Sequence, residues 1–260
     1  MHFAQNLLNL AYRRRINRQI VARSKIIIAL SNDLFRLIEH IRGDLGRALR
    51  QTYGLRYRIV DLALLLFLFS YLGGDVGEGD THTFDMRLLL GAQSLRLGHP
   101  WVAEIMRDLS GLGSTTVLTL FTVAIAGYLA LLSAQTTALL IATSVVSGSV
   151  LVGMFKAVFG RLRPDVAYAV LVVPGLSFPS GHATMSAIVF LTAGALLAST
   201  RSRLAERIYI LLSAALVTAL VGLSRVALGV HWATDVLGGW AFGAAWAIVW
   251  LLIAQKIANR

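Results

Sequence analysis

The feature that most constrains this chain is a series of long apolar segments that follow a basic N-terminal region. They cover residues 59–72, 115–132, 138–159, 183–198, 208–228 and 236–257. A transmembrane helix needs about 20 mostly apolar residues, with a range of about 17–25. The second, third, fifth and sixth segments reach that length alone. The first and fourth reach it with the Gly, Ser and Thr residues beside them. We therefore predict an all-α membrane protein, a polytopic bundle of about six transmembrane helices, with five as the alternative.

The composition excludes other classes of protein. Apolar residues make up 57% of the 260 residues and charged residues 14%, whereas a soluble domain has about 45–50% and about 25%. The composition therefore disfavours an ordinary water-soluble fold and excludes a disordered chain. The absence of cysteine excludes disulfides, thiolate metal sites and a cysteine nucleophile. A net charge of +11 in a soluble protein would suggest nucleic acid. Here we expect membrane topology and anionic partners to explain it, with no nucleic acid.

The N-terminal region differs from the rest of the chain. Residues 1–58 contain 12 of the 24 Lys and Arg residues but only three acids. Apolar residues recur there at helical spacing, at Ile27, Leu30, Leu34, Ile38, Ile41, Leu45 and Leu49. We predict a basic, amphipathic helical head over residues 1–56, either on an anionic lipid surface or packed on the protein itself. Residues 57–260 then form the six-span domain.

The charge distribution predicts an orientation. An even number of spans places both termini on one side, together with the basic head and the Arg residues between 201 and 207. The opposite side receives residues 74–113, with three Arg and six acids. Because Lys and Arg near span ends favour the cytoplasm, we expect cytoplasmic termini. The 160–182 loop and residues 225–235 then share the outer face.

The first motif on that face is Lys156, six further residues, then Arg163 and Pro164. Gly160 is expected to end the third span. Cations at span ends often extend to the membrane surface without any other role. That explanation fits less well here, because Lys156, Arg161 and Arg163 are three cations within eight residues. They also lie on the side of the membrane that the predicted topology leaves poor in Lys and Arg.

The second motif is Pro179-Ser180-Gly181-His182, at the start of the fourth span. Ser is a good N-cap, and a helix N-terminus offers unpaired N–H groups to an anion. Gly181 has no Cβ, so an anion can approach the backbone closely. Alone, this motif is an ordinary turn before a helix.

The third motif is Ser224-Arg225, five further residues, His231, three further residues and Asp235. On a helix, His231 and Asp235 would lie on one face, within reach of a hydrogen bond. A carboxylate on one imidazole nitrogen fixes the tautomer and leaves the other nitrogen free to react. A purely structural Asp–His cap would account for this pair but not for Arg225.

Together the motifs supply three cations, a helix N-terminus, two histidines and one carboxylate. Cations and N–H groups suit a phosphate. Two histidines suit covalent transfer, with one as nucleophile and the other as proton donor to the leaving group. The spacing alone does not say which is which. This face has no carboxylate cluster for Mg²⁺, so we expect no metal and no cofactor.

The three motifs, in this order and spacing, resemble the signature of the type 2 phosphatidic acid phosphatase (PAP2) superfamily, and the six-span body resembles its bacterial membrane branch. The resemblance implies that His231 attacks phosphorus to give a phosphohistidine, that Asp235 orients it, and that His182 protonates the leaving group and later activates water. It further implies a set of phosphate-binding residues, namely Lys156, Arg163, Ser180, Gly181 and Arg225.

The resemblance implies a phosphatase of lipid phosphates or diphosphates in the bacterial inner membrane, with its active site on the outer, periplasmic face. The substrates it implies are undecaprenyl diphosphate, phosphatidylglycerol phosphate, phosphatidate and lipid A phosphates. A lipid phosphotransferase using the same site and a non-catalytic protein that binds or transports lipid headgroups are the alternatives.

Two other features receive structural interpretations. Asp75, Glu78 and Asp80 do not match a calcium loop and are expected to lie in a solvated loop. Gly239 and Gly243 form a GxxxG pattern in an apolar span, which is typical of close helix packing.

Overall fold

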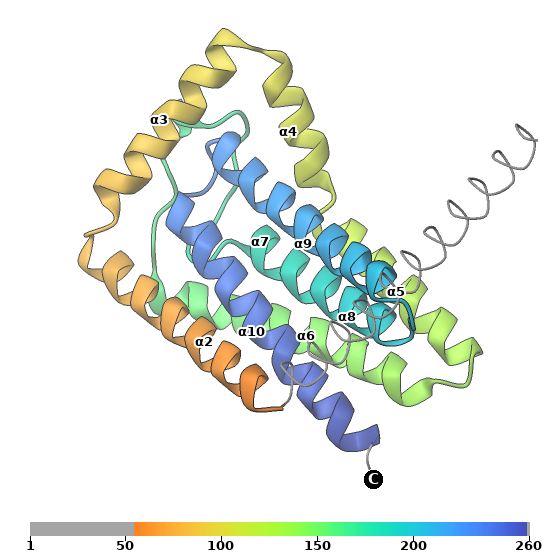
Figure 1. The fold of residues 1–260 in the computed structure, drawn as a ribbon. Helices are drawn as coiled ribbons and strands as arrows, with labels where there is room; N and C mark the ends of the chain where they lie inside the picture. Colours follow the sequence, from red (N-terminus) through yellow and green to blue (C-terminus); the bar gives the residue numbers. More distant parts are fainter. Residues whose placement is uncertain (1–54, 259–260) are drawn as a thin grey trace, which may run out of the picture. The chain divides into compact units, whose positions relative to one another are not determined.

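The computed structural model describes residues 55–258. The predicted head lies outside the described residues, except for the helix backbone of its last two. The described part is helical, and Figure 1 shows how its elements are arranged. They are α2 Leu55–Glu78, α3 His82–Gly98, α4 Trp101–Gly111, α5 Thr115–Leu131, α6 Gln135–Phe159, the 3₁₀ turn η1 Val166–Tyr168, α7 Gly181–Ser186, the π-helical turn η2 Ala187–Leu191, α8 Thr192–Ser199, α9 Leu204–Ala227 and α10 Ala233–Ala258.

The prediction of six spans is confirmed by length and composition. Six helical stretches are long and apolar enough to cross a membrane, with α4 and α5 counted as one stretch and α7, η2 and α8 as another. They are Arg58–Glu78, Trp101–Leu131, Gln135–Phe159, Gly181–Ser199, Leu204–Ala227 and Ala233–Ile257.

The first span ends later than its apolar segment. The helix α2 continues to Glu78, so Asp75 and Glu78 are helical, not part of a solvated loop as predicted. Gly79 has a positive φ of 88° and its N–H donates to the Asp75 carbonyl at 3.0 Å. A left-handed glycine of this kind ends a helix, whereas Gly73 and Gly74 remain inside it.

Residues 74–113, expected as an outer loop, mostly form the helices α3 and α4 (Figure 1). On α3, Leu89 is buried while Leu88, Leu90 and Leu95 are exposed. This helix also buries two charged residues, Asp85 and Arg96. Since burial of a charge requires partners, α3 is a structural part of the body rather than a loose connection.

The helix α10 packs against α2, α6, α7, η2 and α9. Its glycines allow close approach to α7 and η2. A Cβ atom at Gly243 would lie 2.6 Å from the Ala187 Cβ and 2.6 Å from the Thr184 carbonyl oxygen, and one at Gly239 would lie 3.0 Å from the Ser180 carbonyl oxygen. The predicted packing role of the GxxxG pattern is confirmed.

Five phenylalanines, from α2, α6, α10 and the loop that precedes α7, pack together beneath that loop. They are Phe69, Phe155, Phe159, Phe178 and Phe242. The rings of Phe69 and Phe155 lie 4.9 Å apart, and those of Phe159 and Phe178 4.8 Å apart. Phe178 is fully buried, so this cluster fixes the backbone on either side of it.

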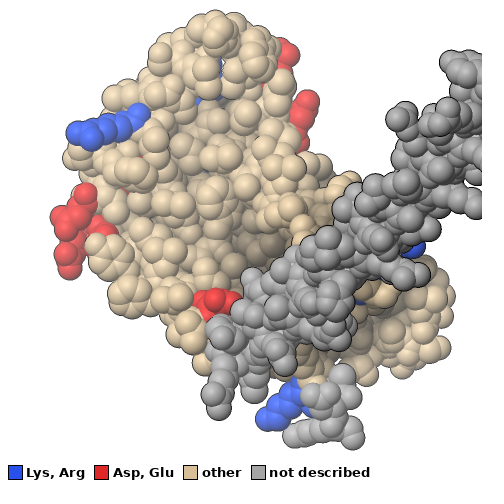
Figure 2. All heavy atoms as spheres, in the orientation of Figure 1, with Lys and Arg blue, Asp and Glu red and all other residues tan. Residues whose placement is uncertain are grey.

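The outside of the helical body is apolar. Leu120, Val150 and Leu216 are each more than half exposed, on three different spans. In Figure 2 most of the visible face of the body carries no charged side chain, and the charges gather near its margins. A surface of this kind matches lipid better than water.

Candidate active site

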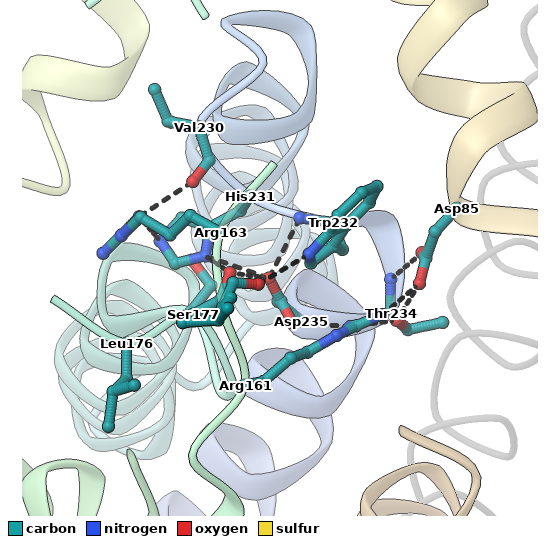
Figure 3. A network of polar contacts seen from close by, with 12 residues as sticks. Asp85, Arg161, Arg163, Leu176, Ser177, Val230, His231, Trp232, Thr234 and Asp235 are labelled. Atoms are coloured by element: carbon teal, nitrogen blue, oxygen red, sulfur yellow. Dashed lines mark hydrogen bonds and ion pairs between the residues drawn. The ribbon is translucent and has the colours of Figure 1, made fainter. Parts of the chain in front are cut away.

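The three sequence motifs meet at one end of the bundle, because α6 and α9 end there and α7 and α10 begin there. The first residues of α2 and the last of α10 lie at the opposite end (Figure 1). Gly160 ends α6 as predicted, in the left-handed conformation at φ 60°, with its N–H on the Lys156 carbonyl at 3.0 Å. The chain then passes through residues 161–180 and lines the site from one side (Figure 3).

His231 and Asp235 form the predicted pair, although His231 lies just before α10 rather than on it. The Nδ1 atom of His231 is 3.2 Å from the Asp235 Oδ2 atom. The same oxygen accepts the Trp232 backbone N–H at 2.9 Å. A carboxylate in the first turn that accepts the N–H of the residue before the helix is one half of a capping box. The helix N-terminus therefore holds the carboxylate in place for the histidine.

A second contact of His231 indicates which of its ring nitrogens carries the proton. The guanidinium Nη1 of Arg163 lies 2.9 Å from the His231 Nε2 atom. Since a guanidinium only donates, Nε2 accepts, and Nδ1 carries the proton that goes to Asp235. Arg163 is itself held by the Val230 carbonyl at 2.8 Å and the Gly175 carbonyl at 3.1 Å. The Nε2 lone pair thus faces a cation.

Burial keeps His231 neutral. The residue is 1% exposed. Its pKa is lowered to about 4, mainly by burial and in smaller part by the charges of Arg163 and Arg225, against the hydrogen bond and charge of Asp235, which raise it. At neutral pH the imidazole therefore has the free lone pair that a nucleophile requires.

Arg225 and Ser180 each keep a buried polar atom without a partner among the described residues. Arg225 is 4% exposed, and its Nη1 donates to the Ser110 Oγ at 2.5 Å, while its Nε has no partner. The Ser180 hydroxyl is also buried and unpaired, although Ser180 precedes α7 as its N-cap residue. Leaving a buried polar group unpaired costs about 1–3 kcal/mol. A bound phosphate would satisfy both groups.

Lys156 and Gly181 complete the predicted phosphate-binding set. The Lys156 ammonium donates to the Leu176 carbonyl at 2.5 Å and the Ser177 carbonyl at 3.2 Å. Two of its three N–H donors therefore hold the loop before α7. At Gly181, the nearest atom to an added Cβ would be 4.0 Å away, the Val152 Cγ1 atom, so the space beside its Cα is open.

His182 lies in the first turn of α7 and is half-buried. It is close enough to Arg225, His231, Arg163 and Lys156 to interact with their charges. The linker between α4 and α5 packs against its ring, since a Cβ on Gly113 would lie 3.4 Å from the His182 Cδ2 atom. Both predicted histidines thus belong to one cluster.

The sequence interpretation assigned no specific role to four residues around this cluster, although it counted Arg161 among the cations of the first motif. Ser177 donates its hydroxyl hydrogen to Asp235 Oδ2 and lies 3.3 Å from His231 Nδ1. Ser110 holds Arg225, as described above. Arg161 and Asp85 form an ion pair of 2.6 Å behind Asp235. Of these, only Ser177 and Arg161 adjoin the motifs, so only they carried a signal in the sequence.

Apart from the two histidines and Asp235, the side chains around this site are cations and hydroxyl groups. Among residues 55–258, no three His, Asp or Glu side chains are grouped so as to hold a metal ion. The geometry instead resembles what a phosphate needs, with guanidinium and ammonium donors around a neutral imidazole.

Comparison with known proteins decides the family. The model of the PAP2 superfamily matches residues 137–258, which include all three motifs. Over 185 residues, the sequence is 31% identical to phosphatidylglycerophosphatase B of Bacillus subtilis strain 168, with 70% of this chain and 88% of that protein covered. The chain belongs to the PAP2 superfamily. The enzyme class that the motifs predicted, a PAP2 lipid phosphatase, is confirmed.

Two solved PAP2-like structures share the fold. The crystal structure of a transmembrane PAP2-type phosphatidylglycerolphosphate phosphatase from Bacillus subtilis matches with a TM-score of 0.70 and 27% identity, over 76% of this chain and 97% of that one. The crystal structure of LpxE from Aquifex aeolicus matches with a TM-score of 0.51 and 23% identity, over 65% of this chain and 95% of that one. This PAP2 enzyme is therefore an integral membrane protein.

Proposed function

We propose that this PAP2 enzyme removes the terminal phosphate of a phospholipid, with phosphatidylglycerol phosphate as the first candidate, through a phosphohistidine on His231. The observation that carries the proposal is the state of His231, a buried neutral imidazole with Asp235 on Nδ1 and the cationic Arg163 at Nε2. An imidazole oriented in this way suits attack on phosphorus.

The phosphate first replaces His231 as the partner of Arg163. Its oxygens accept hydrogen bonds from Arg163, Lys156 and Arg225, and from the Ser180 hydroxyl and the Gly181 N–H. The unpaired Nε of Arg225 and the unpaired hydroxyl of Ser180 support these assignments. Fixed donors around the phosphoryl group stabilise the charge of the transition state.

In the first step, the His231 Nε2 lone pair forms a bond to phosphorus as the bond to the lipid oxygen breaks. The leaving oxygen takes a proton from His182, so the lipid departs as an alcohol. The imidazole gains positive charge, which Asp235 stabilises across Nδ1. In the second step, His182 takes a proton from water, the hydroxide attacks phosphorus, and inorganic phosphate leaves a neutral His231.

The substrate class follows from the position of the site and from the relatives. The site lies at one end of six apolar spans, so a headgroup can enter it while the acyl chains stay in lipid. One curated relative and one solved structure are phosphatidylglycerophosphate phosphatases. We therefore rank phosphatidylglycerol phosphate ahead of phosphatidate, undecaprenyl diphosphate and lipid A phosphates.

The orientation is part of the proposal. With the Lys and Arg bias of the sequence, we place the termini in the cytoplasm, the enzyme in the bacterial inner membrane and the site on the outer face. We assign residues 57–260 to catalysis and residues 1–56 to contact with anionic lipid.

The test is release of inorganic phosphate by the purified, detergent-solubilised full chain, with phosphatidylglycerol phosphate, phosphatidate and undecaprenyl diphosphate supplied separately. EDTA is present throughout, and His231→Ala is the control. We expect release from phosphatidylglycerol phosphate that persists in EDTA and is lost in the control. Faster release from undecaprenyl diphosphate would reassign the substrate. Transfer of the phosphate to an added lipid without release would instead identify a phosphotransferase.

A further inference from the structure

Behind the candidate site, two buried carboxylates share one guanidinium (Figure 3). Arg161 donates from Nη1 to the Asp235 Oδ1 atom at 2.7 Å and from Nη2 to the Asp85 Oδ2 atom at 2.6 Å. Both carboxylates are 0% exposed. Asp85 comes from α3, far from the three motifs in the sequence, and has no part in the mechanism above.

The contacts of Asp85 reach the first turn of α10. Its Oδ1 accepts the Thr234 backbone N–H at 2.9 Å, and its Oδ2 accepts the Thr234 hydroxyl at 2.7 Å. Asp85 therefore caps, from another helix, the same N-terminus that Asp235 caps from within. Two carboxylates near one helix N-terminus are favoured by the helix dipole.

Charge balance explains why a second carboxylate is buried here. If Arg161 paired with Asp235 alone, the two charges would cancel, and Asp235 would stabilise a cationic imidazole less well. With Asp85 included, the group of Asp85, Arg161 and Asp235 keeps a net charge of −1. That charge lies beside the Nδ1 side of His231, where positive charge develops when Nε2 bonds to phosphorus.

We propose that Asp85 and Arg161 are positioning residues that hold Asp235 in place and set the net negative charge it presents to His231. The inference rests on the proposed function in one respect, namely that His231 reacts as a neutral imidazole. Asp235 then uses Oδ1 for Arg161 and keeps Oδ2 for the donors at His231, Trp232 and Ser177.

The other charged and titratable groups that face this pair stay constant in the test. His231 interacts with the charges of Arg163 from the loop and Arg225 from α9 and with His182 from α7, and Asp235 interacts with the charge of Lys156 from α6. Since none of them is altered, a change in the titration of His231 reports on the group of three.

The test compares the acid limb of the pH profile of kcat/KM in Arg161→Gln, Asp85→Asn and the double variant. Arg161→Gln changes the net charge of the group from −1 to −2, which favours protonated His231, so its limb moves to higher pH. Adding Asp85→Asn restores −1 and moves the limb back. We expect each shift to be on the order of one pH unit. Asp85→Asn alone moves the limb to lower pH.

Three controls separate charge from structure. Thr234→Val removes the hydroxyl that contacts both Asp85 and Arg161 without changing charge, so its acid limb stays in place. Arg161→Lys also keeps the charge and should keep the limb. If Arg161→Gln does not fold, Asp85→Asn alone, with its limb expected at lower pH, carries the test. Asp80→Asn removes an exposed carboxylate before α3 and should match the wild type. The proposal would be overturned by a limb that stays in place in Arg161→Gln, by a double variant whose limb stays as far displaced as in Arg161→Gln, or by an equal displacement in Thr234→Val.

A second readout needs no substrate. Nitrogen NMR of protein labelled at its histidines distinguishes neutral from protonated imidazole, so it follows the titration of His231 without a reagent that must enter the site. The titration profile should shift in the same directions as the acid limb. If the wild type releases no phosphate but the titration shifts, the proposed function fails and this inference stands. If phosphate is released and neither profile shifts, the proposed function stands and this inference fails.

Discussion

Asp235→Asn is the change that most directly probes how the site is built. In the folded protein, the two carboxylate oxygens of Asp235 accept from donors on opposite sides. Oδ1 accepts from Arg161 at 2.7 Å, and Oδ2 accepts from the Ser177 hydroxyl, the Trp232 N–H at 2.9 Å and the His231 Nδ1–H at 3.2 Å. An amide has one acceptor oxygen and one donor NH₂ group. In either orientation, Asn therefore turns a donor toward a donor.

The two orientations damage the enzyme in different ways. With its oxygen toward His231, Asn faces the Arg161 guanidinium with NH₂ and offers no charge to the imidazole. With NH₂ toward His231, Nδ1 must become the acceptor and the proton moves to Nε2. The nucleophilic lone pair is then lost, and the Nε2–H faces the Arg163 donor. The corresponding change of tautomer in a serine-protease triad costs roughly 10⁴-fold in kcat. We expect a similar loss here, which corresponds to about 5.4 kcal/mol of transition-state stabilisation.

The assay is steady-state release of phosphate together with thermal unfolding of the same preparation. Because Arg161 keeps Asp85 as a partner, the loss of folding stability should stay below the roughly 3–5 kcal/mol typical of a broken buried ion pair. A folded Asp235→Asn enzyme with kcat within tenfold of the wild type would refute the assigned role of Asp235.

Three further outcomes are expected. Ser110→Ala removes the hydroxyl that holds Arg225 at 2.5 Å, so KM should rise about tenfold with a smaller change in kcat, measured by steady-state kinetics. Gly229→Ala should destabilise the fold by more than about 1 kcal/mol in thermal unfolding. Gly229 has φ 73°, and an added Cβ would lie 2.1 Å from the Tyr168 carbonyl oxygen. Since burial lowers the pKa of His231 to about 4, kcat/KM should be independent of this residue at neutral pH and fall only near pH 4, as a pH–rate profile would show.

Each of these expectations has a control or a contrary result. Gly127→Ala, on α5, adds a Cβ with no neighbour within 4 Å, so the melting temperature should stay or rise. An equal fall in Gly127→Ala and Gly229→Ala would argue against strain at Gly229. An unchanged KM in Ser110→Ala would show that Arg225 binds the substrate without the contact from the Ser110 hydroxyl. An acid limb near pH 6.5 would mean that His231 is not desolvated in the working enzyme.

The sequence predicted the bundle because span length and hydrophobicity are local properties. It also predicted that the motifs share one end, since alternate spans run in opposite directions and the motifs follow or precede the correct ones. The end of α2 was predicted too early because its apolar run stops before the helix does. The left-handed Gly79, rather than the change in polarity, ends that helix.

The supporting residues were not predictable in the same way. Asp85 is one of six acids between residues 74 and 113, and nothing near it in the sequence distinguishes it from exposed Asp80. Its role arises from contacts with Arg161 and Thr234, which are 76 and 149 residues away. Ser110 likewise meets Arg225 across 115 residues. Such pairings depend on how α3 and α4 pack on the bundle, and a single sequence does not encode them as a local pattern.

The proposed phosphohistidine on His231 can be trapped and located. The full chain reacts with substrate labelled in its terminal phosphate, is quenched in alkali within one turnover, and is digested for mass spectrometry. His182→Ala and His231→Ala are run in parallel. We predict an alkali-stable phosphoryl group on the peptide that contains His231, present in the wild type and absent from His231→Ala. Label on the His182 peptide instead, or turnover by His231→Ala at the wild-type rate, would contradict it.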